Sequence, residues 1–226
     1  MKKQIVVIGL GRLGFSLATT LYSLGHDVLA LDTDEKNVQS TASQVTRTVQ
    51  ADATNETILR ELGIGNFDIA AVTIEGAIEK SVLSTILLKR LGVRYIIARA
   101  DNELHGSILE KIGADKVIYP EREMGAGIAH VLSLGDVIDY IPVTPGYGVV
   151  KLIAPPSFVG ETLSGLGFGS KGKMKVAVLL MLRKQEVIIT PSDAEVVKPG
   201  DTLVVSGNWD NLEQIFAKFQ KTSRRE

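Results

Sequence analysis

Three glycines near the start of the chain, Gly9, Gly11 and Gly14, have the spacing that most clearly predicts chemistry. They follow a short aliphatic stretch and open a helical pattern, and Asp32 ends the next aliphatic stretch. In this arrangement the first glycine permits a tight turn, the second leaves room for a phosphate, and the third lets the helix pack against the strand. N–H groups at the helix start bind phosphates, and the acid accepts hydrogen bonds from ribose hydroxyls. The pattern predicts a nucleotide site; the alternative is a tight turn without a ligand.

Arg12 lies inside the glycine loop and bears on which nucleotide is bound. A nicotinamide dinucleotide presents about two negative charges and ATP about four, so a guanidinium in the loop suits a nucleoside di- or triphosphate better. The alternative is that Arg12 faces solvent at the start of the helix. Thr33, not an arginine, follows Asp32, so a 2′-phosphate finds no obvious partner and NADP is the least expected ligand.

A second polar group, Asp52-Ala53-Thr54, follows the third aliphatic stretch. The carboxyl ends of parallel strands face the ligand crevice, so these residues are expected near the nucleotide. Asp52 either reads the adenine amino group or caps the helix that begins near Glu56, and the sequence leaves both interpretations open. Arg99 ends the fifth stretch at the same edge.

Glu121 follows Pro120 at the start of a predicted helix beyond the sixth strand. Bound phosphates would repel this carboxylate unless a cation lay between them, so Glu121 is a candidate metal ligand. The alternative, which the spacing alone favours, is an acid in the first turn that the helix dipole stabilises.

These residues require a parallel sheet to bring them together. Short aliphatic stretches alternate with helical patterns over about the first 135 residues, which predicts a Rossmann-like, doubly wound α/β sheet with right-handed crossovers. The predicted strands are Gln4–Ile8, Asp27–Leu31, Thr46–Val49, Ile69–Thr73, Tyr95–Arg99 and Lys116–Ile118.

The pattern changes after a helix predicted from about Glu121 to Leu134. Residues 141–148 are rich in turn-forming types, and a small α+β module is predicted beyond them. Its expected elements are strands at Gly148–Ile153, Lys175–Arg183, Glu186–Thr190 and Thr202–Gly207 and a helix at Asn211–Gln220. The predicted domains are therefore residues 1–135 and 140–220, with a boundary near 136–144 and a polar tail at 221–226.

Composition narrows the classes of function. The formal net charge is −1, which does not favour nucleic acid as a partner. There is no cysteine, and the three histidines are well separated, so thiolate chemistry is excluded and a local histidine metal site is not expected. The longest apolar run, Val176–Leu182, is too short to cross a membrane. A cytoplasmic protein is expected, with any membrane role arising through a partner.

The second module also bears on the choice between an enzyme and a sensor. A dehydrogenase needs a substrate domain with an acid or base and an anchor, and this module contains neither histidine nor cysteine. We therefore expect a nucleotide sensor without catalytic residues, whose occupancy shifts a conformation. The alternatives are an NAD(H)-dependent oxidoreductase, an NAD(H)-responsive sensor, and an assembly module with a vestigial cleft.

The whole chain resembles the RCK (regulator of K⁺ conductance) family, of the KtrA/TrkA type. The resemblance rests on motifs in both modules: residues 7–14, Leu31-Asp32, Asp52-Ala53-Thr54, residues 109–115, Tyr119-Pro120-Glu121 and residues 198–207. It implies a cytoplasmic regulatory subunit, a homodimer assembled into an octameric ring, that acts on a membrane potassium-translocating subunit of the KtrB/TrkH kind.

The resemblance also implies ligands and their residues. ATP and ADP would compete for the cleft, and cyclic di-AMP is a candidate ligand of the second module. Glu121 matches the acid that helps bind Mg²⁺ or Ca²⁺ between subunits. The remaining roles fall to phosphate-binding Gly9, Gly11, Arg12, Leu13 and Gly14, ribose-binding Asp32, adenine-flanking Asp52, Ala53 and Thr54, and Arg99 at a position that is basic in relatives.

The chain departs from the family pattern at Glu75, in a stretch where KtrA relatives often have a Gly-Ala-Asn turn. This carboxylate adds negative charge near the expected phosphate end of the cleft. The preference between ATP and ADP therefore stays open unless Mg²⁺ or Ca²⁺ screens the charge.

Overall fold

The computed structural model describes residues 1–133, 137–169 and 175–214. By its internal contacts the chain forms two compact units, Met1–Pro120 and Glu121–Glu226. This division falls after the first residue of the helix Pro120–Ser133, and the sequence-based boundary at 136–144, with domains 1–135 and 140–220, stays a prediction. The expected tail at 221–226 and the end of the expected last helix lie outside the described residues.

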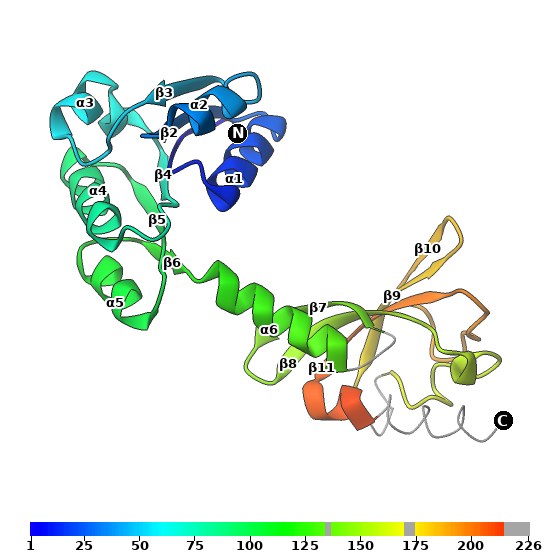
Figure 1. The fold of residues 1–226 in the computed structure, drawn as a ribbon. Coiled ribbons are helices and arrows are strands. Elements are labelled where there is room, and N and C mark those ends of the chain that lie inside the picture. Colours follow the sequence, from blue (N-terminus) through cyan, green and yellow to red (C-terminus); the bar gives the residue numbers. More distant parts are fainter. Residues whose placement is uncertain (134–136, 170–174, 215–226) are drawn as a thin grey trace. The chain divides into compact units, whose positions relative to one another are not determined.

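The first unit is built on a six-stranded parallel sheet with the order β3-β2-β1-β4-β5-β6 (Figure 1). This is the strand order of a dinucleotide-binding fold, so the predicted Rossmann-like sheet is confirmed. The direction of winding reverses between β1 and β4, and that is where such folds bind ligands. The strands are β1 (Gln4–Ile8), β2 (Asp27–Asp32), β3 (Arg47–Gln50), β4 (Ile69–Val72), β5 (Tyr95–Arg99) and β6 (Lys116–Ile118).

Helices cover both faces of this sheet, because alternate residues of each buried strand point to opposite faces. Ile5 and Val7 of β1 lie in the core beneath α1 and α2, and Val6 and Ile8 lie in the core beneath α3, α4 and α5. The helices are α1 (Arg12–Ser23), α2 (Glu35–Thr41), α3 (Glu56–Glu61), α4 (Ile78–Leu91) and α5 (Glu103–Lys111), with a 3₁₀ turn η1 (Ile64–Asn66).

The second unit contains a five-stranded antiparallel sheet with the order β10-β9-β11-β8-β7. It confirms the predicted α+β module but adds one strand that the sequence did not predict. The elements are α6 (Pro120–Ser133), β7 (Val137–Thr144), β8 (Tyr147–Ile153), the 3₁₀ turn η2 (Pro156–Phe158), β9 (Ala177–Arg183), β10 (Glu186–Ile189) and β11 (Thr202–Asn208). Residues 209–214 are helical and form the described part of the expected last helix.

The interpretation of residues 141–148 as turn-rich was wrong except at the centre of that stretch, because its two ends lie in strands. Pro142 lies inside β7, beside a shift in the register with β8. A proline has no N–H to donate, but β7 is an edge strand and the irregular pairing tolerates the loss. Only Pro145 and Gly146 form the turn of the hairpin.

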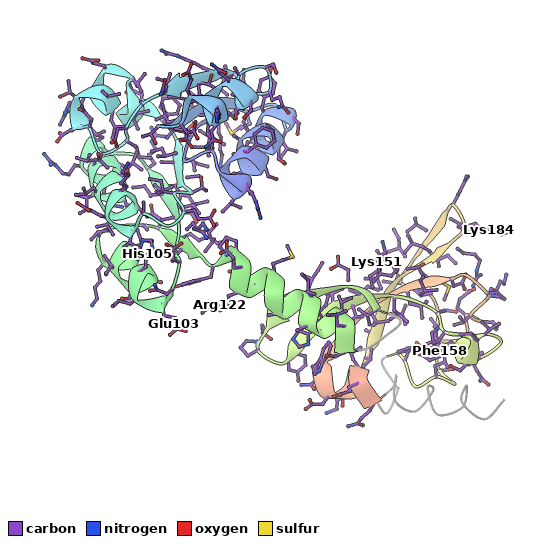
Figure 2. The ribbon with its side chains drawn as sticks, viewed as in Figure 1. Glu103, His105, Arg122, Lys151, Phe158 and Lys184 are labelled. Atoms are coloured by element: carbon purple, nitrogen blue, oxygen red, sulfur yellow. The ribbon has the colours of Figure 1, made fainter. Side chains whose placement is uncertain are left out.

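One face of the second sheet holds the core of this unit. Phe158 and Phe168 pack edge to face, with ring centroids 5.9 Å apart, and Met181 and Leu203 are fully buried beside the same cluster. Figure 2 shows Phe158 within the unit and Lys184 at the tip of the β9–β10 hairpin. None of the helices in the described ranges is both long and apolar enough to cross a bilayer.

Arg183 ties β9 to the start of β11 and to the segment between β10 and β11. Its guanidinium donates two hydrogen bonds to Asp201, at 3.0 and 2.8 Å, and one to Glu195 at 2.8 Å. Asp201 is buried, which by itself would raise the pKa of its carboxyl group. Hydrogen bonds from Arg183 and from the Lys198 N–H outweigh burial, and the pKa of Asp201 lies below its ordinary value.

We predict that Asp201→Asn lowers the free energy of unfolding of the second unit by about 2–4 kcal/mol, because Arg183 loses a buried partner. The contribution of a carboxylate with a lowered pKa is complete above about pH 4 and is lost as the pH falls through the folded-state pKa. Urea unfolding followed by fluorescence of Trp209, the only tryptophan of the chain, measures this unit. Equal losses of stability on acidification in wild type and variant would contradict the prediction.

Candidate functional site

The glycine loop between β1 and α1 is shaped by close contacts that only glycine permits. Gly9 has φ +92°, and its N–H donates to the Leu31 carbonyl at 2.8 Å. A Cβ on Gly14 would strike the Gly9 carbonyl oxygen and lie 2.6 Å from Thr73 Oγ1. The predicted tight turn and close helix packing are therefore confirmed, whereas the phosphate contact of Gly11 stays a prediction.

Asp32 holds this loop from the neighbouring strand. Its carboxylate accepts hydrogen bonds from the Leu10 N–H at 2.5 Å, from the Asp34 N–H at 2.8 Å and from Asn37 Nδ2 at 3.3 Å. The side chain therefore lies at the carboxyl end of β2 beside the loop, where ribose-binding acids lie in dinucleotide-binding folds.

A cleft of about 260 Å³ opens at the carboxyl edge of the sheet, at the point where the strand order reverses. Six of the predicted site residues line it: Gly9, Gly11, Asp32, Asp52, Ala53 and Glu75. The cleft is also lined by Asn37, Thr73 and Lys80, which were not predicted from the sequence. Among the ionisable residues of the described lining, three are carboxylic acids and one, Lys80, is a base.

Asp52 organises the turn that follows β3. Its Oδ1 accepts hydrogen bonds from the Thr54 N–H at 2.9 Å and from Thr54 Oγ1 at 2.7 Å. These bonds and the nearby charge of Lys80 hold the pKa of Asp52 below its ordinary value despite some burial. Asn55, and not Asp52, caps α3 by accepting from the N–H groups of Thr57 and Ile58, so the capping interpretation of Asp52 was wrong.

The other predicted residues of this part of the chain do not line the cleft. Arg12 is the first residue of α1 and is exposed, Leu13 is partly buried, and Gly14 is packed under the loop. Thr54 reaches the site through Asp52. Contacts of these residues with a nucleotide stay predictions.

Arg99 is buried at the end of β5, with only 5% of its surface exposed. Its guanidinium donates to Asp101 at 2.7 Å and lies 3.7 Å from a carboxylate oxygen of Glu75, so it connects the cleft to the segment before α5. There His105 Nδ1 accepts the Asp101 N–H at 3.2 Å, and burial lowers the pKa of the imidazole. Figure 2 labels His105 on α5.

Glu121 is exposed in the first turn of α6, a position that the helix dipole favours. Within the described ranges, no three His, Asp or Glu side chains are grouped so as to hold a metal ion. The role of Glu121 as a metal ligand therefore stays a prediction.

Two of the three residues that the sequence analysis missed carried a local signal. Thr73 directly follows β4, which neighbours β1, and its hydroxyl donates to the Gly9 carbonyl at 2.6 Å. Lys80 lies in the first turn of the helix that follows β4, at the edge where parallel strands end. Asn37 acts through Asp32, and its position in α2 carried no comparable signal.

Comparisons with known proteins agree over both units. The TrkA-N domain family matches residues 5–120, and the TrkA-C domain family matches residues 149–220. Ktr system potassium uptake protein C from Bacillus subtilis (strain 168) is 38% identical over 215 residues, 95% of this chain and 96% of that protein.

Solved structures share the fold at low sequence identity. A crystal structure of the GsuK RCK domain superposes with a TM-score of 0.53 and 22% identity over 96% of this chain, which spans about half (47%) of that chain. The GsuK channel bound to NAD gives a TM-score of 0.52 and 22% identity over 96% of this chain and 38% of that chain.

We predict that Gly14→Ala destabilises the first unit by about 1–3 kcal/mol, because the new methyl group has no room beside the Gly9 carbonyl and Thr73. Gly11→Ala is the matched control, since its Cβ would meet nothing closer than Glu75 Oε2 at 3.9 Å. Because Gly11 is the N-cap of α1, where glycine is preferred to alanine, the cost of Gly11→Ala should stay below about 1 kcal/mol. Urea unfolding followed by circular dichroism compares the two variants, and equal stabilities would contradict the packing argument.

Proposed function

The chain belongs to the TrkA family, with a TrkA-N domain followed by a TrkA-C domain, and on this premise we propose that it is a nucleotide-sensing regulatory subunit of a potassium-uptake system. The family expected from the sequence motifs is thereby confirmed. One observation carries the proposal: the glycine loop and Asp32 meet in a cleft at the point where the strand order reverses.

ATP and ADP are the proposed ligands. The first N–H groups of α1 and the Gly11 backbone would bind phosphates, with Leu13 in the same turn, and Asp32 would accept the ribose hydroxyls. Asp52, Ala53 and Thr54 would flank the adenine. Arg12 is exposed beside the glycine loop. It would reach the phosphates of the nucleotide bound in this cleft or the phosphates of a nucleotide bound by a neighbouring copy.

The cleft is small and open. Its volume of about 260 Å³ lies just below the roughly 300–1,000 Å³ of typical ligand pockets. NAD(H) is the alternative ligand, since GsuK has been captured with NAD.

The proposed partner is a membrane potassium-translocating subunit of the KtrB/TrkH kind, with this chain at its cytoplasmic face. We propose a homodimer that assembles into an octameric ring, in which ADP and ATP favour different conformations. The exposed apolar residues Met124, Ile128 and Leu132, spaced four apart on α6, support assembly because a second copy would bury them.

Two further ligands belong to the proposal. Glu121 would help bind Mg²⁺ or Ca²⁺ together with the nucleotide or a neighbouring copy. Cyclic di-AMP would bind the second unit, where a cleft of about 200 Å³ has Phe168, Pro191 and Asp193 in its lining.

We predict that Asp32→Ala weakens ATP and ADP binding at least about tenfold, because the ribose loses a charged acceptor. Asp32 also holds Leu10, so the test compares ATP with 2′,3′-dideoxy-ATP by calorimetry. Removing the hydroxyls should weaken binding to the wild type and leave binding to the variant unchanged. Equal losses in both proteins would show that Asp32 acts only through the loop.

We also predict that Gly11→Ala weakens nucleotide binding with only a small loss of stability, because its methyl group would occupy the space of a phosphate. Calorimetry with ATP, ADP and NADH measures this effect. Tight NADH binding without binding of either adenine nucleotide, or turnover of any of the three, would overturn the proposed function. Potassium flux through the purified complex, measured with ATP and with ADP, tests the regulatory role.

A further inference from the structure

Glu75 lies in the cleft beside the residue that is proposed to leave room for a phosphate. It belongs to the segment between β4 and α4 and lines the cleft together with Gly11. Its Oε2 is 3.9 Å from the position that a Cβ of Gly11 would occupy. A negative charge of the protein therefore lies within a few ångströms of the expected phosphates.

Arg99 balances this charge only in part. Its guanidinium lies 2.7 Å from an oxygen of Asp101 and 3.7 Å from an oxygen of Glu75, so Asp101 is the closer partner. The Glu75 side chain is 64% exposed, whereas that of Arg99 is 6% exposed. The negative charge of Glu75 is therefore only partly neutralised by Arg99, and the carboxylate is exposed in the open cleft.

Lys80 compensates a different carboxylate. Hydrogen bonds from Thr54 are the main cause of the lowered pKa of Asp52, and the charge of Lys80 adds to it, so the ammonium group lies within electrostatic reach of the turn after β3. Counted over the described lining, Asp32, Asp52 and Glu75 carry three negative charges against the one positive charge of Lys80. The cleft itself thus disfavours additional phosphate charge.

We propose that Glu75 selects the ligand by charge, so that without a divalent cation the cleft binds ADP more tightly than ATP. The inference rests on the proposed function, that an adenine nucleotide occupies this cleft. Two charges a few ångströms apart at a solvated site change a binding constant by about three- to fivefold. Each additional unit of phosphate charge beside Glu75 lowers affinity by about that factor, and a bound Mg²⁺ cancels the effect.

Glu75→Gln tests the proposal because it removes the charge and keeps the shape of an exposed side chain. Glu79→Gln is the matched control, since Glu79 is also an exposed glutamate but lies on α4, outside the cleft lining. Calorimetry with ATP, ADP and adenosine is carried out on both variants and on the wild type, first in EDTA and then in Mg²⁺. Thermal unfolding verifies that all three proteins have equal stability.

In EDTA, the wild type and Glu79→Gln should bind ADP about three- to fivefold more tightly than ATP. Glu75→Gln should strengthen the binding of ATP more than the binding of ADP, so that the two affinities become similar. The affinity for adenosine should be unchanged. Mg²⁺ should reduce the difference between the ADP and ATP affinities in the wild type and have little effect on that difference in Glu75→Gln.

This inference would be overturned, while the proposed function stands, by either of two results. The ratio of the ATP and ADP affinities could be the same in Glu75→Gln as in the wild type, or Glu79→Gln could change that ratio by the same factor. A wild type that binds neither nucleotide would instead overturn the proposed function, and this inference with it. The two failures are therefore distinguishable in the same set of titrations.

Discussion

The structure of the first unit depends on the close approach of α1 to the ends of β1 and β4. Gly14 packs against the Gly9 carbonyl with no room for a side chain, and Thr73 donates to that same carbonyl. Asp32 holds the next N–H of the loop from β2. Three neighbouring strands thus fix the loop before any ligand arrives, so binding does not have to order it, and the N–H groups of α1 are oriented in advance.

The same rigid edge brings more negative than positive charge to the cleft. Asp32 and Asp52 have roles in holding the loop and the turn, which accounts for two of the acids, whereas Glu75 remains largely exposed. A sensor does not need the tightest binding, because only the difference in affinity between two states or two ligands shifts a population. In the proposed sensor, a moderate electrostatic difference at Glu75 would suit that task better than strong phosphate binding by a dense cluster of bases.

Much of this architecture could be predicted from the sequence, because its strongest signals are local. The six aliphatic strands and the glycine loop are continuous patterns, and the structure confirms both. The edge strand β7 was missed because Pro142 indicates a turn in sequence, while its tolerance depends on a position at the sheet edge. Asn55 directly precedes α3, so a local rule could have identified it as the cap, and Lys80 carried the signal of a first-turn position after β4. The place of Asn37 in the cleft, by contrast, follows from how separate segments meet in space.

The exposed apolar residues of the second unit support the proposed assembly. Met124, Ile128 and Leu132 are between 52% and 77% exposed on α6, and Ile141 and Val143 of β7 are also largely exposed. Burying such side chains against a second copy is favourable by about 25 cal/mol per Å² of apolar surface. A nucleotide bound to one copy can influence the neighbouring copies only under one condition. The ATP-bound and ADP-bound conformations must differ in how much of this apolar surface they bury between copies. In the proposed ring, the free energy of assembly and the free energy of ligand discrimination would then be linked, and the exposed charge of Glu75 would act on the whole assembly through the nucleotide that it selects.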